Sequence, residues 1–190
     1  MLDSFAARGV RELCTQPTSE RSVKQAHRRL DALGALRWLA AQREVDASRL
    51  ALLGWSNGGS TVLAATNRKV AVVAQAGIVP RAAVAFYPGC EMEARRGHGS
   101  SATLLLLVGA SDDWTPAQPC IDLAACSRGR TRAVVYDGAF HGFDGTEPLR
   151  VRKDVPRGTR PGQGVTGGGN SAAREASQRE LIGFLRAELR

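Results

Sequence analysis

The chain of 190 residues has the length of one domain, and 43% of its residues are apolar, enough for a sizeable core. Its net charge of +8 comes almost wholly from arginines, which are scattered with few aromatic neighbours and so indicate an arginine-rich composition rather than a nucleic-acid-binding surface. No apolar run approaches the ~18 residues of a membrane span, so we expect neither nucleic acid nor membrane as a partner.

The first residues contain no apolar stretch of the kind found in signal peptides, and Asp3 places a charge early, so we expect a cytoplasmic protein. The chain has four cysteines, namely Cys14, Cys90, Cys120 and Cys126. They form no CxxC pair and no histidine stands at metal-ligand spacing, so we expect no metal and no cofactor. A disulfide between Cys90 and Cys120 is left open, because both residues end short loops that follow expected strands.

The first expected element is a helix over residues 19–43. Ser19 and Ser22 suit its start, and no proline interrupts it. Its apolar positions recur at steps of three and four residues, as an amphipathic helix requires. They are Val23, Ala26, Leu30, Leu33, Leu36 and Leu39 or Ala40.

Strands and helices alternate along the rest of the chain. The expected strands are 50–54, 81–89, 102–110 and 132–139, and the expected helices are 58–67 and 171–189. The strand 102–110 is apolar on both faces, which is typical of a parallel sheet covered on both sides. Residues 144–170 are rich in glycine, proline and arginine without periodicity, which predicts a long surface loop. The alternation indicates an α/β protein with a mostly parallel sheet covered by helices.

The stretch "GWSNG" at 54–58 matches G-x-S-x-G between an expected strand and an expected helix, the context of a nucleophile elbow. In so tight a turn the serine backbone is strained, and side chains at Gly54 and Gly58 would collide. Ser56 is thus the expected nucleophile, and the amide of Asn57 would face a developing oxyanion. A nucleotide-binding turn is the rival interpretation, but the chain lacks both G-x-G-x-x-G and a lysine after these glycines.

A serine nucleophile needs a base, and in this class the chain order is serine, then carboxylate, then histidine. His27 precedes Ser56 and lies in the first expected helix, while His98 lies in a polar loop. His141 follows an expected strand in "FHGFD", so His141 is the expected base.

The orienting carboxylate should also follow a strand, and Asp112 and Asp113 stand together after the apolar run 102–110. The spacing G-x-x-D-x-x-T-P favours Asp112, counted from either end of the loop. Asp113 should then point elsewhere, with the cap of a helix in "TPAQPCIDLAA" as one place for it.

The blocks "GWSNGGSTVL", "AAVAFYPGC", "LLLLVGASDDWTPAQPC" and "YDGAFHGFD" together resemble the dienelactone hydrolase family, within the α/β-hydrolase fold. The resemblance runs from about residue 3 to the C-terminus. The best-known members carry cysteine at the nucleophile position, so with Ser56 this chain is similar to the serine branch. The resemblance implies hydrolysis of an ester or lactone.

Members of this family begin with several strands and a loop that supplies the second amide of the oxyanion hole. Here "LDSFAARGVREL" resembles the end of such a strand and the loop after it. We therefore expect residues 1–190 to form a single domain that lacks its N-terminal strands, with Met1 at an internal position of a longer protein. The sheet should have about four main strands, an open edge beside 50–54 and no second amide facing Ser56.

These inferences predict a serine hydrolase acting on a small-molecule ester or lactone through Ser56, Asp112 and His141. Four aromatic residues flank this set and are candidates for either a substrate pocket or the core: Trp55, Trp114, Phe140 and Phe143. The alternative is a catalytically impaired, truncated relative that acts as a binding or vestigial protein. The sequence does not determine the oligomeric state.

Overall fold

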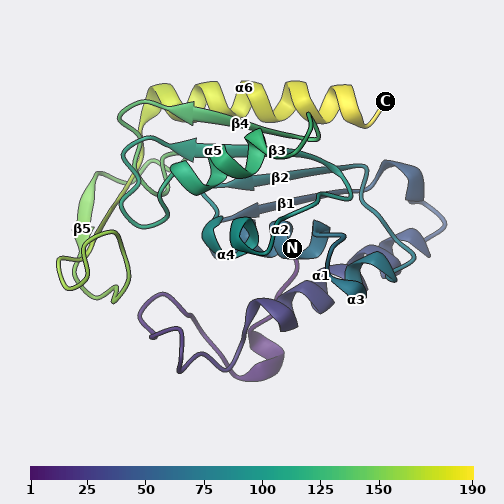
Figure 1. The fold of residues 1–190 in the computed structure, drawn as a ribbon, viewed down its shortest axis with the longest axis horizontal. Helices are drawn as coiled ribbons and strands as arrows, with labels where there is room; N and C mark the ends of the chain where they lie inside the picture. The colour runs from purple at the N-terminus through teal and green to yellow at the C-terminus, as the bar shows by residue number, and fades with distance from the viewer.

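A four-stranded parallel sheet with helices on both faces forms the centre of the computed structural model, which describes all 190 residues (Figure 1). The strands, in their spatial order, are β1 Ala51–Trp55, β2 Ala82–Phe86, β3 Thr103–Gly109 and β4 Thr131–Tyr136. The helices are α1 Gln25–Ala40, α2 Asn57–Thr66, α3 Ala71–Ala74, α4 Glu91–Arg95, α5 Gln118–Ala125 and α6 Ser171–Glu188, with short 3-10 turns η1 Ala6–Arg8 and η2 Ala47–Arg49. None of these helices is both long and apolar enough to cross a bilayer.

Successive side chains of the inner strands alternate between the two faces of the sheet, as pleated strands require. Leu104 and Leu106 of β3 face the layer that contains α2 and α5. Leu105 and Leu107 face α6, which lies along the other side of the sheet (Figure 1). These leucines are fully buried, which confirms the prediction that this strand is covered on both faces.

The strand β1 lies at one edge of the sheet and pairs with β2 alone. This confirms the expected four-strand sheet with an open edge beside residues 50–54. Two apolar side chains of this strand are partly exposed, Leu53 at 38% and Trp55 at 43%. Both lie on the α6 side of the sheet, in register with Val84 and Phe86.

The first long helix, α1, begins at Gln25 rather than at residue 19, so the predicted start was wrong. Lys24 is extended and forms the N-cap, and its amide donates to His27 Nδ1. The turns before it bury Val23 instead of continuing the helix. The apolar stripe was also partly wrong: Leu33 is buried, whereas Leu30 is exposed because the helix turns that position to solvent.

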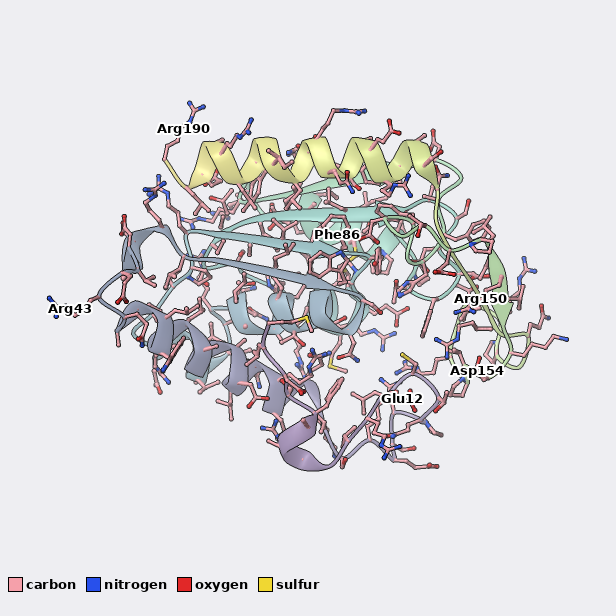
Figure 2. All side chains as sticks on the ribbon, turned by 180° about the vertical axis from the view of Figure 1, so that it is seen from behind. Glu12, Arg43, Phe86, Arg150, Asp154 and Arg190 are labelled. Atoms are coloured by element: carbon pink, nitrogen blue, oxygen red, sulfur yellow. A yellow bond between two sulfur atoms is a disulfide. The ribbon has the colours of Figure 1, made fainter.

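The predicted structureless loop 144–170 contains a short antiparallel hairpin, β5 Arg150–Arg152 and β6 Val165–Gly167. A strand of three residues is too short to show an alternation of apolar and polar residues in the sequence. Contacts with distant segments of the chain stabilise this pair of strands. Arg157, between the two strands, donates to Thr18 of the N-terminal segment. Figure 2 shows this hairpin, marked by Arg150 and Asp154, beside the N-terminal loop that carries Glu12.

The structure joins Cys90, the N-cap of α4, to Cys120 of α5 in a disulfide with 5.1 Å between the Cα atoms. Both cysteines are buried in the core on the α2 side of the sheet. The bond that the sequence left open therefore ties the loop after β2 to the helix after β3.

Candidate active site

The three residues selected from the sequence all follow strands of the parallel sheet. Ser56 comes directly after β1, Asp112 follows β3, and His141 follows β4. Because the carboxyl ends of parallel strands meet at one edge of a sheet, the topology alone brings these three loops close together.

A chain of two hydrogen bonds connects these residues. His141 Nε2 lies 2.8 Å from Ser56 Oγ, and His141 Nδ1 lies 2.8 Å from Asp112 Oδ2. The side chain of Asp112 is completely buried and that of His141 is 7% exposed. A carboxylate can only accept, so Nδ1 carries the hydrogen in this arrangement and Nε2 is free to take a proton from the serine.

The backbone at Ser56 has φ 51° and ψ −117°, a strained conformation for a residue with a side chain. A Cβ on Gly54 would lie 2.4 Å from the carbonyl oxygen of Gly58, so glycine is required there as predicted. The expectation for Gly58 itself was wrong, because a Cβ at that position would meet nothing within 4 Å. The second crowded position is Gly59, where a Cβ would lie 2.9 Å from the carbonyl oxygen of Phe86.

Asn57 is the first residue of α2, so its backbone N–H has no carbonyl one turn earlier to bond. Its side chain is held from α1, since Gln25 Nε2 donates to Asn57 Oδ1 at 3.0 Å and Arg28 donates to the same oxygen. Burial lowers the pKa of Arg28. Because Asn57 is the first residue of α2, its backbone N–H lies at the positive end of the helix, beside Ser56.

The carboxylate of Asp112 is held by its own loop. The backbone amides of Trp114 and Thr115 donate to Oδ1 at 2.9 and 2.8 Å. The Thr115 hydroxyl lies 2.9 Å from Oδ2 and 3.1 Å from His141 Nδ1. Sequence analysis used Thr115 for its spacing but assigned it no contact, although a threonine three residues after a buried carboxylate is well placed for such a turn.

The neighbouring Asp113 bonds to Thr166 and not to His141. Its Oδ1 accepts from the Thr166 amide at 2.7 Å, and its Oδ2 accepts from the Thr166 hydroxyl at 2.9 Å. It therefore fastens the hairpin strand β6 to the loop after β3. The idea that it caps the following helix was wrong, because the N-cap of α5 is Ala117 and makes no side-chain cap bond.

Two aromatic rings pack against the His141 imidazole. The ring of Trp114 is 4.5 Å from it, and the ring of Tyr87 is 4.6 Å from it, between centroids. Arg152 of the hairpin lies over the Trp114 ring at 5.6 Å. Tyr87 was not selected from the sequence, since nothing in "AFYPG" indicates a contact with a histidine far along the chain.

The other aromatic candidates take different places. Trp55 stacks on Phe86 with 5.5 Å between the ring centroids and is partly exposed. Phe140 is partly buried. Phe143 is completely buried in the core on the α6 side, which is the alternative that the sequence left open for it.

The remaining histidines lie outside this set. His27 is exposed on α1. His98 Nε2 is 3.0 Å from the carbonyl oxygen of Leu63 at the end of α2, and burial lowers the pKa of His98. Neither is hydrogen-bonded to Ser56.

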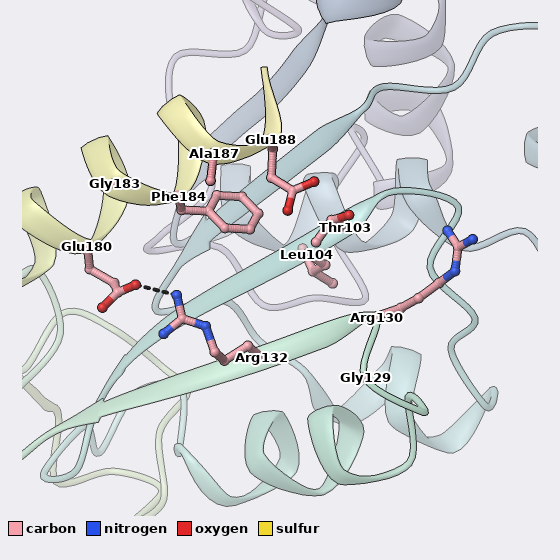
Figure 3. A pocket seen from close by; sticks show the side chains of 10 residues that line it. All are labelled: Thr103, Leu104, Gly129, Arg130, Arg132, Glu180, Gly183, Phe184, Ala187 and Glu188. Carbon is pink, nitrogen blue, oxygen red and sulfur yellow. Dashed lines mark hydrogen bonds and ion pairs between the residues drawn. The ribbon is translucent and has the colours of Figure 1, made fainter. Parts of the chain in front are cut away.

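A hollow of about 380 Å³ lies at the opposite end of the sheet, beside the first residues of β3 and β4 and the last turns of α6 (Figure 3). An ion pair between Arg132 and Glu180 borders it. Its lining contains no serine, cysteine or histidine, in contrast to the set at the carboxyl ends of the strands.

A parallel sheet covered by helices, with a serine at a glycine-lined strand-to-helix turn, defines an α/β-hydrolase fold. Residues 6–188 match the dienelactone hydrolase family, and the chain belongs to that family. None of the curated proteins matches this sequence.

Solved structures with the same fold show low identity to this chain. A dienelactone hydrolase-like promiscuous phosphotriesterase, P91 from metagenomic libraries, is 24% identical over 88% of this chain and 64% of its own, with a TM-score of 0.59. Thermogutta terrifontis esterase 2 phosphorylated by paraoxon is 17% identical over 87% of this chain and 66% of its own, with a TM-score of 0.58. A Mycobacterium tuberculosis puromycin-hydrolyzing peptidase is 20% identical over 60% of this chain and 22% of its own, with a TM-score of 0.51. The chain thus spans less than two thirds of each of these proteins.

The glycine contacts predict opposite effects for two alanine substitutions. Gly54→Ala should destabilise the protein by about 1–3 kcal/mol, because the new methyl group would press on backbone atoms of α2. Gly58→Ala should stabilise it by about 0.5–1 kcal/mol, because the site is open and helical. Urea unfolding of both variants measures the difference, and equal losses in the two would contradict the assignment of the close contact.

Proposed function

We propose that this protein is a serine hydrolase that cleaves a small-molecule ester or lactone. The observation that carries the proposal is the hydrogen-bonded chain from Ser56 through His141 to Asp112. Membership of the dienelactone hydrolase family supports the reaction class. Similar structures described as an esterase and as a promiscuous phosphotriesterase are consistent with hydrolysis of an ester.

In the first step Ser56 Oγ bonds to the carbonyl carbon of the substrate while its proton passes to His141 Nε2. The imidazole becomes positively charged, and Asp112, buried against Nδ1, stabilises that charge and keeps the ring in the required tautomer. The backbone strain at Ser56 holds the hydroxyl out of the helix and toward the imidazole.

The carbonyl electrons move onto oxygen, and the N–H of Asn57 at the start of α2 is the donor best placed to receive that oxyanion. When the carbon–oxygen bond of the substrate breaks, His141 returns its proton to the departing oxygen. A water molecule then attacks the acyl carbon while His141 takes its proton. The bond from that carbon to Ser56 Oγ breaks, His141 returns the proton to Oγ, and the acid is released.

The aromatic rings around His141 suggest where substrate carbon atoms would bind. Trp114 packs beside the imidazole and is itself partly exposed, so its free surface adjoins the reacting serine. We assign Trp114 to the wall of the substrate site, with Arg152 of the hairpin covering one side of that ring. Phe140 and Trp55 are further candidates for this wall, since both are at least partly exposed.

Replacing the nucleophile should abolish turnover. Ser56→Ala is expected to lower kcat for a short-chain aryl ester by on the order of 10⁴- to 10⁶-fold while the circular dichroism spectrum stays unchanged. Ser171→Ala, at an exposed serine that begins α6, is the matched control and should retain full activity. Undiminished hydrolysis by Ser56→Ala would contradict the proposal.

The two adjacent carboxylates should differ sharply in kinetics. Asp112→Asn removes the acceptor that fixes the imidazole tautomer, and kcat should fall on the order of 10⁴-fold. Asp113→Asn keeps an oxygen to accept from Thr166 and should cost far less. Steady-state kinetics on the same ester decides, and a larger loss for Asp113→Asn would overturn the role given to Asp112.

A further inference from the structure

A third carboxylate is hydrogen-bonded to two loops of the proposed site. Asp144, three residues after His141, accepts a hydrogen bond at each oxygen. The Tyr87 hydroxyl donates to Oδ1 at 2.7 Å, and the Trp55 indole N–H donates to Oδ2 at 2.7 Å. We propose that Asp144 is a positioning residue that keeps His141 in register with Ser56; this inference rests on the proposed function.

The bridge joins the loops that carry the reacting groups. Trp55 is the residue immediately before Ser56, at the end of β1. Tyr87 immediately follows β2, and Asp144 belongs to the segment of His141 after β4. One carboxylate therefore connects the segment of His141, after β4, to the nucleophile turn after β1 and to the end of β2. The strand β2 lies between β1 and β4 in the sheet.

Tyr87 contacts both Asp144, through its hydroxyl group, and the imidazole of His141, through its ring. Its ring packs with its centroid 4.6 Å from that of the His141 ring, which Trp114 also contacts at 4.5 Å. Its carbonyl oxygen also accepts from the Thr115 hydroxyl at 3.0 Å, next to Asp112. A shift of the Tyr87 ring would thus disturb both hydrogen bonds of the imidazole.

The backbone of Tyr87 is strained, with φ at 36°, a value that non-glycine residues rarely adopt. A strained backbone conformation persists only where contacts with the surrounding residues stabilise it, and such residues are common at functional sites. The amide of Tyr87 donates to Leu107 at 2.7 Å, and the hydroxyl end is held by Asp144. Burial, followed by the hydrogen bond to Asp144, raises the pKa of Tyr87, so the phenol stays protonated as the donor.

Removal of the carboxylate tests the proposal. Asp144→Ala should lower kcat for ester hydrolysis by on the order of 10²-fold with KM little changed, because a displacement of about 1 Å at a reacting group has that cost. Asp137→Ala is the matched control, since Asp137 is an exposed carboxylate in the same segment before His141 and makes no side-chain hydrogen bond. Equal kinetics for Asp144→Ala and Asp137→Ala would overturn the proposal.

Two further variants separate positioning from general stability. Asp144→Asn can still accept from Trp55 and donate to the Tyr87 oxygen, so it should recover much of the lost kcat. Tyr87→Phe keeps the ring and loses one bond, and combining it with Asp144→Ala should cost less than the sum of the two separate losses. Additive losses, or an asparagine variant as slow as alanine, would contradict a bridge through this carboxylate.

A readout that does not need turnover keeps this inference distinct from the proposed function. The Nδ1 proton of His141, hydrogen-bonded to Asp112, can be followed by proton NMR. The signal should persist in Asp137→Ala and broaden or vanish in Asp144→Ala. A wild-type protein without ester turnover would contradict the proposed function alone, whereas an unchanged signal in Asp144→Ala would overturn the positioning role.

Discussion

The close approach of β1 to α2 is the contact on which the geometry of the site depends. Gly54 on the strand meets the backbone of Gly58, and Gly59 on the helix meets the carbonyl of Phe86. Because no side chains separate these segments, the chain reverses within one residue, and Ser56 takes a backbone conformation that turns its hydroxyl toward His141. A wider turn would leave the hydroxyl out of reach of the imidazole.

The parallel sheet brings the functional loops to one edge, but it does not align them to within hydrogen-bonding distance. Three carboxylates supply that finer alignment. Asp112 binds His141, Asp113 fastens the hairpin through Thr166, and Asp144 joins the histidine segment to the loops after β1 and β2. Each accepts bonds from a segment distant in sequence. The strands therefore determine which loops meet, and these three carboxylates determine how closely the loops approach one another.

Much of this arrangement could be predicted from the sequence. The apolar run 102–110 predicted β3 because every side chain of a strand covered on both faces is buried. Ser56, Asp112 and His141 could be selected because each lies in a short motif directly after an expected strand. The start of α1 was misplaced because burial of Val23 overrode the helical pattern.

Other features could not be predicted because they depend on contacts between distant segments. The hairpin of β5 and β6 is too short for periodicity and is held by Asp113 and by a bridge from His141. The role of Gly59 depends on β2, and the bonds of Asp144 depend on two other loops.

The central claim is that Ser56 is the nucleophile, and covalent trapping tests it most directly. Treatment with a dialkyl aryl phosphate should place one dialkyl phosphoryl group on Ser56, with release of the aryl oxide, as peptide mass spectrometry would show. A group found on another residue, or persistent ester turnover with no group attached, would contradict the account.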